Sequence, residues 1–367
     1  MTNNKTCNVE IKVSPYKRKL KLPKGEGLGC VHPEVIYFPE GYLGYKYWLF
    51  YTPYPPDHAE LPYLVRSNNG IDFTDKGVRN PLLNRGPQDS WDSHHIADVD
   101  VLVHNGRWYL YYAGARVRNG VKEVKIGVAY SENGLEWEKY GDNPILEPDP
   151  DLEWEKGTRD RRDVATPTVI YVNEAFYMYY SALGSDGKVR IGVAVSKDGV
   201  HFEKYKRNPV LEPEYEWEGD RVNHPDVILY GDLILLLYIA GTSEQRSLGL
   251  AYAKVDNPHD LKKVSEKPIM EPKEDLTSRM LSKIFNHMPF TLSMLRRLSR
   301  ILTGNYTKIS SPLWYHYSIY RSSLLSNPKR ELVLLEEDKT LLYFSCYSSL
   351  TKLPSIGVVE TKVKITS

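Results

Sequence analysis

Residues 97–114, ADVDVLVHNGRWYLYYAG, decide the fold that we expect for this chain. A short apolar strand begins at an acidic residue, a turn at Asn105-Gly106 follows, and the second strand is rich in tyrosine. Asn-Gly between two apolar runs is the strongest short-range signal for a β-hairpin. A third strand, KIGVAY at residues 125–130, leads through another Asn-Gly turn into LEWEKY and NPILEP. The stretch therefore predicts an antiparallel unit of about four short strands.

Versions of this unit recur along the chain, with first strands that begin at His32, Asp98, Thr166 and His224. The starts are roughly 58 to 68 residues apart, and four strands at such a period are typical of a β-propeller. In that fold each blade buries its faces against its neighbours, whereas a β-sandwich would not repeat the same signature four times. We therefore expect a single all-β domain, a five-bladed β-propeller.

The fifth unit is the weakest of the repeats. Residues 331–343, ELVLLEEDKTLLY, align without a gap with residues 226–238, and SIGVVETKV at residues 355–363 supplies a third strand. The N-terminal strand at residues 8–22 could add the missing outer strand and close the ring, which removes open sheet edges. The predicted blades are residues 32–83, 97–148, 164–213, 222–272, and 327–367 with strand 8–22.

Residues 273–326 interrupt the repeats before the last blade and are predicted to be a small helical and aromatic insertion. Apolar residues recur there at helical spacing among several Arg and Lys residues. We favour a helical cap packed on the propeller over a basic membrane-surface element at residues 273–305 or a contact with a partner. The aromatic stretch LWYHYSIYR, residues 313–321, would lie near the pocket.

Composition narrows the class of protein. The chain has 367 residues, 41% of them hydrophobic, which predicts a globular protein, and its net charge of +1 argues against a general nucleic-acid binder. Cys7, Cys30 and Cys346 form no disulfide framework and have no metal spacing, and the N-terminus lacks an apolar signal segment. We expect a cytoplasmic protein with no cofactor and no metal; the sequence leaves the oligomeric state open.

The first strands of the blades are expected to line the central channel, so equivalent positions should meet in space. His32, Asp98, Thr166 and His224 occupy the first position. Two residues further, on the same side of an extended strand, come acidic or hydroxyl side chains. Carboxylates and imidazoles that converge at one mouth make a candidate site. The residues at the second of these positions are Glu34, Asp100, Thr168, Asp226 and Glu331.

Plainer interpretations of these residues stay open. His32 and His224 could cap their strands, and Asp98 and Asp100 could bind turn amides. Asp163 could pair with Arg161 or Arg162 on a solvated loop. A metal held by His32 and His224 is a minor alternative, because the sequence has no compact ligand motif.

The chain resembles the five-bladed β-propeller glycosidases of glycoside hydrolase families 43, 32, 68, 117 and 130. The resemblance rests on the repeated first strand, the YxYY second strand, the IGVAxSxDG third strand and the NPIL or NPVL ending. It implies acidic residues on the first strands of blades one to three, acting as nucleophile or base, as pKa-tuning carboxylate and as general acid. Asp98 matches the second of these. His32 stands where the resemblance implies the first-blade acid, and Glu34 lies two residues further on. Ala165 stands where it implies the third-blade glutamate, and the nearest acid is Asp163.

The function predicted is cleavage of a glycosidic bond in an oligo- or polysaccharide by paired carboxylates, because one must protonate the leaving oxygen while another activates the attacking group. The alternatives are a glycoside phosphorylase and a non-catalytic carbohydrate-binding propeller. The predicted catalytic residues are Glu34, Asp98 and Asp163, and the predicted substrate-binding residues are His32, His95, Asp100, Arg162, His224 and Asp226.

Overall fold

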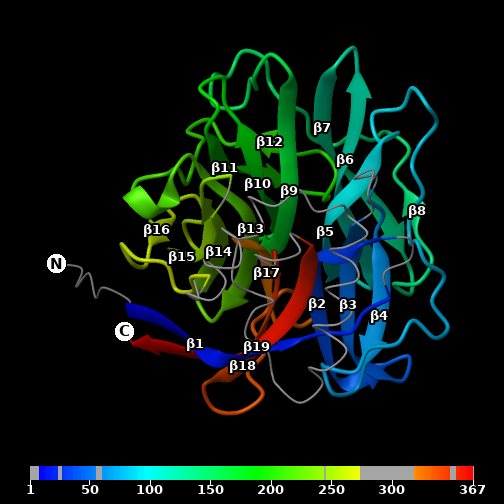
Figure 1. Ribbon diagram of the computed structural model, residues 1–367, viewed down its shortest axis with the longest axis vertical. Helices are drawn as coiled ribbons and strands as arrows, with labels where there is room; N and C mark the ends of the chain where they lie inside the picture. The colour runs from blue at the N-terminus through cyan, green and yellow to red at the C-terminus, as the bar shows by residue number, and fades with distance from the viewer. Residues whose placement is uncertain are drawn as a thin grey trace, which may run out of the picture.

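The computed structural model describes residues 8–23, 27–54, 60–243, 245–272, 318–347 and 353–366. This part of the chain is all-β, apart from one 3-10 turn, η1 (Glu216–Glu218). Short antiparallel groups of strands stand around a common centre, in chain order from blue to red (Figure 1). The repeated sequence unit corresponds to one such group.

Each group is a meander in which consecutive strands pair antiparallel. The first comprises β2 (Gly29–Tyr42), β3 (Tyr45–Tyr54) and β4 (Tyr63–Ser67). The second comprises β5 (His95–His104), β6 (Arg107–Arg118), β7 (Val121–Ser131) and β8 (Glu138–Lys139). The third comprises β9 (Arg161–Val172), β10 (Ala175–Leu183), β11 (Val189–Ser196) and β12 (Glu203–Lys204).

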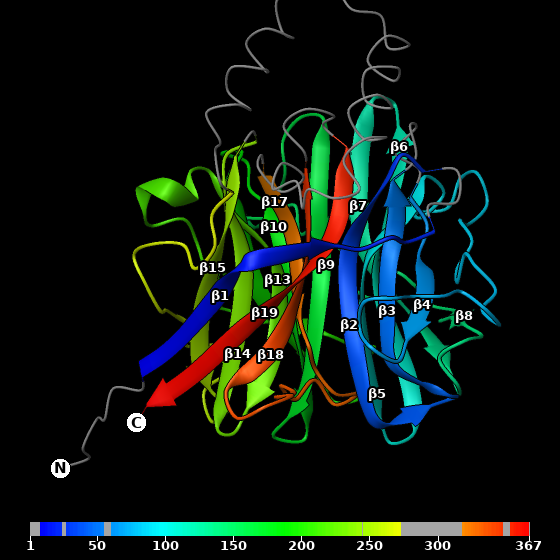
Figure 2. The ribbon, with the colours of Figure 1, turned by 60° about the horizontal axis from the view of Figure 1, so that its bottom comes forward.

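The remaining groups follow the same pattern. The fourth comprises β13 (Arg221–Tyr230), β14 (Leu233–Gly241), β15 (Arg246–Lys254) and β16 (Lys262–Lys263). The last comprises β17 (Ser318–Leu324), β18 (Lys339–Tyr347) and β19 (Pro354–Thr366), with β1 (Asn8–Lys19) paired antiparallel to β19. The two ends of the described chain thus lie side by side (Figure 2).

The core lies between neighbouring groups rather than within one. Leu102 and Tyr111 of the second group pack with Val169 and Met178 of the third in one buried apolar cluster. Aromatic and branched side chains suit such stacked pleated faces, which explains why the repeats are rich in tyrosine. Because each sheet needs its neighbours for burial, the first strands β2, β5, β9, β13 and β17 are held side by side around the axis.

The repeated tryptophans pack inside their own groups. Trp217 stacks on Tyr238, with ring centroids 6.1 Å apart. The adjacent Glu218 is fully buried, accepts a hydrogen bond from the Tyr238 hydroxyl at 2.8 Å and pairs with Lys263 at 2.6 Å. A tryptophan against a tyrosine ring, next to a buried carboxylate paired with a lysine, recurs with Trp91, Asp92 and Lys139 and with Trp154, Glu155 and Lys204.

The last group differs from the prediction. Its first strand is β17, which lies within the range predicted as insertion, and residues 331–338 form no strand of their own. The alignment of residues 331–343 with residues 226–238 was therefore wrong at its start. The reason is that β17, SIYRSSL, lacks the apolar pattern and the acidic residue of the other first strands. Residues 273–317, the rest of the predicted helical insertion, lie outside the described residues.

Within the described ranges, we find no helix that is long and apolar enough to cross a membrane.

Candidate active site

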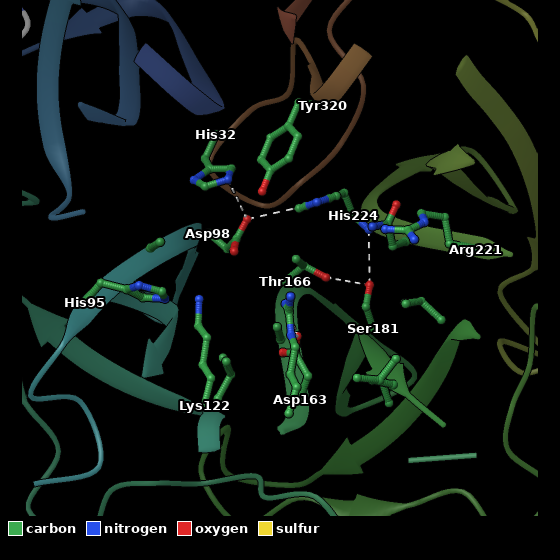
Figure 3. Close-up of a pocket in the computed structure, with 18 of the residues that line it drawn as sticks. His32, His95, Asp98, Lys122, Asp163, Thr166, Ser181, Arg221, His224 and Tyr320 are labelled. Atoms are coloured by element: carbon green, nitrogen blue, oxygen red, sulfur yellow. Dashed lines mark hydrogen bonds and ion pairs between the residues drawn. The ribbon is translucent and has the colours of Figure 1, made fainter. Parts of the chain in front are cut away.

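The side chains of the candidate site are aimed by a bulge that recurs at the start of the first strands. His32, Asp98, Thr166 and His224 all have positive φ, between 48° and 54°. At each of them the pairing with the second strand slips by a residue. Non-glycine residues rarely adopt this left-handed conformation, and such strain concentrates at functional sites. The bulge turns each of these side chains toward a central cavity (Figure 3).

This cavity has a volume of about 280 Å³, close to the lower end of small-molecule sites. Tyr320 of β17 completes the wall beside the four bulge residues. Its ring centroid lies 5.2 Å from that of His32 and 4.7 Å from that of His224. Burial and the charge of Asp98 raise the pKa of Tyr320, so its hydroxyl keeps its proton.

Asp98 is the anionic centre of the cavity. Its Oδ1 lies 3.3 Å from Nε2 of His32, 3.4 Å from Nδ1 of His224 and 3.3 Å from a guanidinium nitrogen of Arg321. Burial alone would raise the pKa of Asp98, but His32, His224 and Arg321 outweigh it and hold that pKa below its usual value. Asp98 is therefore a carboxylate. The other oxygen, Oδ2, bonds to none of the described residues and is available to a ligand.

His32 connects Asp98 to a second carboxylate. Its Nδ1 lies 3.1 Å from Oε2 of Glu60 and 2.8 Å from the hydroxyl of Thr52, which itself donates to Glu60 at 2.8 Å. Glu60 is buried and lines the cavity. The imidazole thus has a carboxylate at each ring nitrogen, an arrangement that fixes its orientation and can relay a proton.

Two further imidazoles are kept neutral. Burial lowers the pKa of His224 to about 4, and burial together with the charge of Lys122 lowers the pKa of His95 to about 4. At neutral pH these rings can accept or donate one hydrogen bond per nitrogen without carrying charge.

We expect the free energy of unfolding to fall as the pH is lowered from about 6.5 to about 4. In that range the unfolded chain binds protons that the folded His95 and His224 resist, at a cost of up to about 3 kcal/mol for each imidazole. Thermal melts at half-unit pH intervals measure the effect. The His95→Asn variant should show a flatter dependence over the same range, and parallel curves for the variant and the wild type would contradict the assignment.

Basic side chains also line the cavity. Lys122 forms no ion pair with a described residue, and burial and the nearby Arg161 lower its pKa. Arg161 binds Asp163 through Nε at 2.7 Å and through a second guanidinium nitrogen. Arg221 and Arg246 stand on another part of the wall. The cavity therefore combines a carboxylate centre with cationic walls.

Five predicted site residues do line this cavity, and they are His32, His95, Asp98, Asp163 and His224. The pairing of Asp163 with Arg161 agrees with the plainer interpretation of that loop, although Asp163 is buried. Arg162 is not in the cavity; it is half exposed and lies 3.5 Å from Glu123. Side chains alternate along β9, so Arg161 and Asp163 face the cavity and Arg162 faces away.

The remaining three predicted residues lie below the cavity. Glu34, Asp100 and Asp226 have at most 1% of their surface exposed and surround the buried guanidinium of Arg330. The Arg330 nitrogens contact Asp226 at 2.6 Å and Asp100 at 3.3 Å, and bond Glu34 as well. In this position a substrate cannot reach the three side chains. Glu34 therefore does not fit its predicted role as an acid or base, and Asp100 and Asp226 do not fit their predicted role as sugar ligands.

These buried side chains instead connect neighbouring groups. Asp100 accepts a hydrogen bond from the amide of Val169 in the next first strand, and Asp226 accepts one from Leu324. Thr168 and Ser323 accept from Val227 and Val35 in the same way.

Several cavity residues were not predicted. Glu60 precedes β4, Lys122 and Arg246 lie at the start of the third strands, and Tyr320 belongs to β17. Glu60, Lys122 and Arg246 occupy positions that do not repeat among the units, and Tyr320 stands at the bulge of the diverged first strand of the last group. Only the aromatic stretch at residues 313–321 gave a signal, since it was expected near the pocket. Among the described residues, no group of three or more His, Cys, Asp or Glu side chains is arranged to hold a metal ion.

Comparison with known proteins places the chain among carbohydrate-active enzymes. A family model of glycoside hydrolase family 130, described as beta-1,4-mannooligosaccharide phosphorylase, matches residues 63–278. The A type blood N-acetyl-alpha-D-galactosamine deacetylase of Flavonifractor plautii is 24% identical over 184 residues, 42% of this chain and 23% of that protein. The 1,2-beta-oligomannan phosphorylase of Thermoanaerobacter sp. (strain X514) is 29% identical over 111 residues, 28% of this chain and 36% of that protein. The chain thus aligns with well under two thirds of the length of these relatives.

Solved structures share the fold at low sequence identity. The deacetylase from F. plautii, in complex with blood group B trisaccharide, has a TM-score of 0.60 at 17% identity, with 97% of this chain and 95% of that chain covered. A family 117 glycoside hydrolase, Zg3597 from Zobellia galactanivorans, has a TM-score of 0.60 at 15% identity, with 97% and 90% covered. These likenesses establish a β-propeller fold of the glycosidase type.

Proposed function

Because this chain belongs to glycoside hydrolase family 130, a family of carbohydrate-active enzymes, we propose that it cleaves a glycosidic bond with inorganic phosphate as the acceptor. The observation that carries the proposal is the charge pattern of the cavity. Lys122 and Arg161 face the same space as the carboxylate Asp98, and Lys122 has no counter-ion among the described residues. Cationic donors of this kind bind phosphate through strong, charge-assisted hydrogen bonds.

Phosphorolysis also suits the carboxylates that remain in the cavity. A hydrolase needs a carboxylate that activates water, whereas phosphate is itself the nucleophile. One phosphate oxygen bonds to the anomeric carbon as the glycosidic carbon–oxygen bond breaks. The leaving oxygen gains one proton and the phosphate loses one, so the reaction consumes none overall. The predicted hydrolase with Glu34 as one of the paired carboxylates fits less well, since Glu34 is buried against Arg330.

Asp98 is assigned the central role in this reaction. Its ionised Oδ2 stabilises the positive charge that develops at the sugar ring or accepts a hydrogen bond from a sugar hydroxyl. His32, between Asp98 and Glu60, holds that carboxylate in place and can move a proton. Asp163, whose Oδ1 is buried without a hydrogen-bond partner, remains the candidate for proton transfer to the leaving oxygen.

The test is the phosphate dependence of the reaction. Purified protein would be incubated with β-mannosides and a panel of other oligosaccharides, with and without inorganic phosphate. We expect a sugar 1-phosphate to form only when phosphate is present, as measured by anion-exchange chromatography. Equal release of free sugar with and without phosphate would contradict phosphorolysis and favour hydrolysis. Binding of sugars without any turnover would favour the non-catalytic propeller.

A second candidate function is removal of an acetyl group from an N-acetylated sugar. The observation that favours it is the cluster of three imidazoles, His32, His95 and His224, around one carboxylate, which suits activation of water for acyl cleavage. A relative with that activity aligns over 184 residues. Release of acetate from N-acetylhexosaminides without cleavage of the glycosidic bond would support this candidate.

The blade count and the closure of the ring also belong to this proposal. We infer five blades, with β1 as the outer strand of the last one, supported by the antiparallel pairing of β1 with β19. The chain ends would then be joined by hydrogen bonds rather than left as open edges. Deletion of residues 1–22 should abolish the soluble folded protein; an unchanged melting temperature would contradict the closure.

A further inference from the structure

Two arginines of the fourth strand group stand side by side over a glycine. Arg221 begins β13 and Arg246 begins β15, and both pair in register with Gly241 at the end of β14. Residues paired on one rung carry their side chains on the same face, so Arg221 and Arg246 flank Gly241 about 10 Å apart at their Cα atoms. A Cβ at Gly241, where φ is 139°, would lie 2.2 Å from the carbonyl oxygen of Gln245. Only glycine therefore fits the backbone at this position.

The charges of this pair are poorly compensated. Arg246 donates from Nε to the carbonyl oxygen of Thr242 at 3.3 Å and lies with its guanidinium carbon 5.2 Å from the centre of the Tyr320 ring. No described carboxylate pairs with it. Among the described residues, Arg221 forms an ion pair only with Asp220, at 2.6 Å, and about half of that carboxylate side chain is exposed to solvent.

The pair is also partly withdrawn from water. Only 18% of the Arg221 side chain is exposed, and both arginines line the cavity of Asp98. Burial lowers the pKa of Arg246, and the positive charge of Arg221 lowers it further. Like charges held together away from water are costly unless an anion joins them. Arg221 and Arg246 thus lack a buried negatively charged partner among the described residues.

We propose that Arg221 and Arg246 bind an anionic substituent of the sugar, so that the substrate is an acidic glycan that carries a carboxylate, phosphate or sulfate group. This inference rests on the proposed function, because it names the substrate class of the same cavity. A planar guanidinium matches such oxyanions with two parallel hydrogen bonds, and two of them can hold one group from both sides.

The arginine pair is separate from the cations assigned to inorganic phosphate. Lys122 comes from β7, and Arg161 from the start of β9, where it is paired with Asp163. Figure 3 shows Lys122 and Arg221 on opposite sides of the cavity, with Thr166 and Ser181 between them. One wall can therefore hold the attacking phosphate while the other holds the charged substituent of the sugar.

Binding measurements on matched sugars test the inference. The probes are methyl β-D-glucuronide, glucose 6-phosphate and glucose 6-sulfate against methyl β-D-glucoside, and inorganic phosphate alone, each titrated by calorimetry. We expect the wild type to bind at least one acidic probe about tenfold more tightly than the neutral sugar. The acidic probe that binds best identifies the source of the anionic group.

Three variants separate the two walls. Arg246→Met should lose the preference for the acidic sugar and keep its affinity for inorganic phosphate, and Lys122→Met should do the reverse. Arg207→Met, on the outer surface against Tyr205, controls for loss of one positive charge and should match the wild type.

The outcomes for the two proposals are distinguishable. Equal affinity of the wild type for acidic and neutral sugars would overturn the acidic-substrate inference. Loss of phosphate binding in Arg246→Met with the sugar preference unchanged would also overturn it and leave phosphorolysis intact. A third outcome is that Arg246→Met loses the preference for the acidic sugar while the wild type forms no sugar 1-phosphate. This result would support the inference and contradict the proposed function.

Discussion

The Asp98→Asn variant is expected to lose about a thousandfold in kcat/KM, because a positioned carboxylate that acts on the reacting sugar contributes effects of this size. Asparagine keeps the shape of the side chain and one acceptor oxygen for His32 or His224. It removes the negative charge that Oδ2 presents to the cavity. Initial rates of sugar 1-phosphate formation, at a temperature well below unfolding, measure the loss.

Asp163→Asn is the matched comparison for this prediction. Asp163 lines the same cavity, but its charge is already shared with Arg161 through two contacts. Because Asp163 is the proposed proton donor, we expect a loss comparable to that of Asp98→Asn; a loss at least tenfold smaller would mean that Asp163 only orients Arg161. A comparable loss would assign Asp163 the proton transfer. An Asp98→Asn enzyme within tenfold of the wild type, with an unchanged near-ultraviolet spectrum, would remove Asp98 from the centre of the mechanism.

The convergence of His32, Asp98 and His224 could be predicted from the sequence because these residues occupy equivalent positions in repeated units. Equivalent residues of repeated units lie close together in space although they are far apart in the sequence, because each unit has the same orientation relative to the central axis. The prediction needed no knowledge of the intervening sixty residues. It follows that the cavity wall contributed by the repeated first strands was the predictable part of the site.

Glu34, Asp100 and Asp226 were misplaced because the prediction assumed regular alternation along the first strands. In a regular strand residues two apart face the same side. The bulge at the preceding position, with its positive φ, breaks that period. The bulge residue then faces the cavity, and the residue two positions on turns under it toward the next strand group.

Arg330 could not be predicted from the sequence, and Arg321 was expected near the pocket only as the last residue of the aromatic stretch 313–321. Both belong to the last strand group, which lacks the apolar first strand of the other units. Arg321 follows Tyr320 at the register shift between β17 and β18 and reaches Asp98, and Arg330 comes from the loop between β17 and β18. The most diverged unit thus supplies the two buried arginines at the centre. Equivalent positions in the other units do not predict them, because this unit has a different sequence at those positions.

These two cations organise the axis in two tiers. In the upper tier Arg321 bonds Asp98 and the carbonyl oxygen of Val99, at the floor of the cavity. In the lower tier Arg330 gathers Glu34, Asp100 and Asp226. Asp100 and Asp226 of the lower tier accept hydrogen bonds from backbone amides of neighbouring strands. The residues that join the strand groups therefore lie next to the residues that line the cavity.

Arg330→Met is expected to lower the free energy of unfolding by about 3–5 kcal/mol, because it leaves three buried carboxylates without their cation. Burial already raises the pKa of Glu34 and of Asp100, against the opposing charge of Arg330. A carboxyl group with a raised pKa stabilises the fold only while it is protonated, and that stability is lost as the pH rises through its folded pKa. The damage should therefore be larger at pH 8 than at pH 5, as measured by urea unfolding.

A second variant keeps this prediction testable if Arg330→Met alone does not fold. Arg330→Met combined with Glu34→Gln and Asp226→Asn removes two of the three negative charges together with the positive one, and nearly isosteric amides fill the space. Replacing a whole buried ionic cluster costs far less than removing one partner. We expect the triple variant to regain most of the lost stability and its pH dependence to flatten. A triple variant no more stable than Arg330→Met would mean that the backbone contact of Arg330 with the carbonyl oxygen of Val227, rather than its charge, holds the centre together.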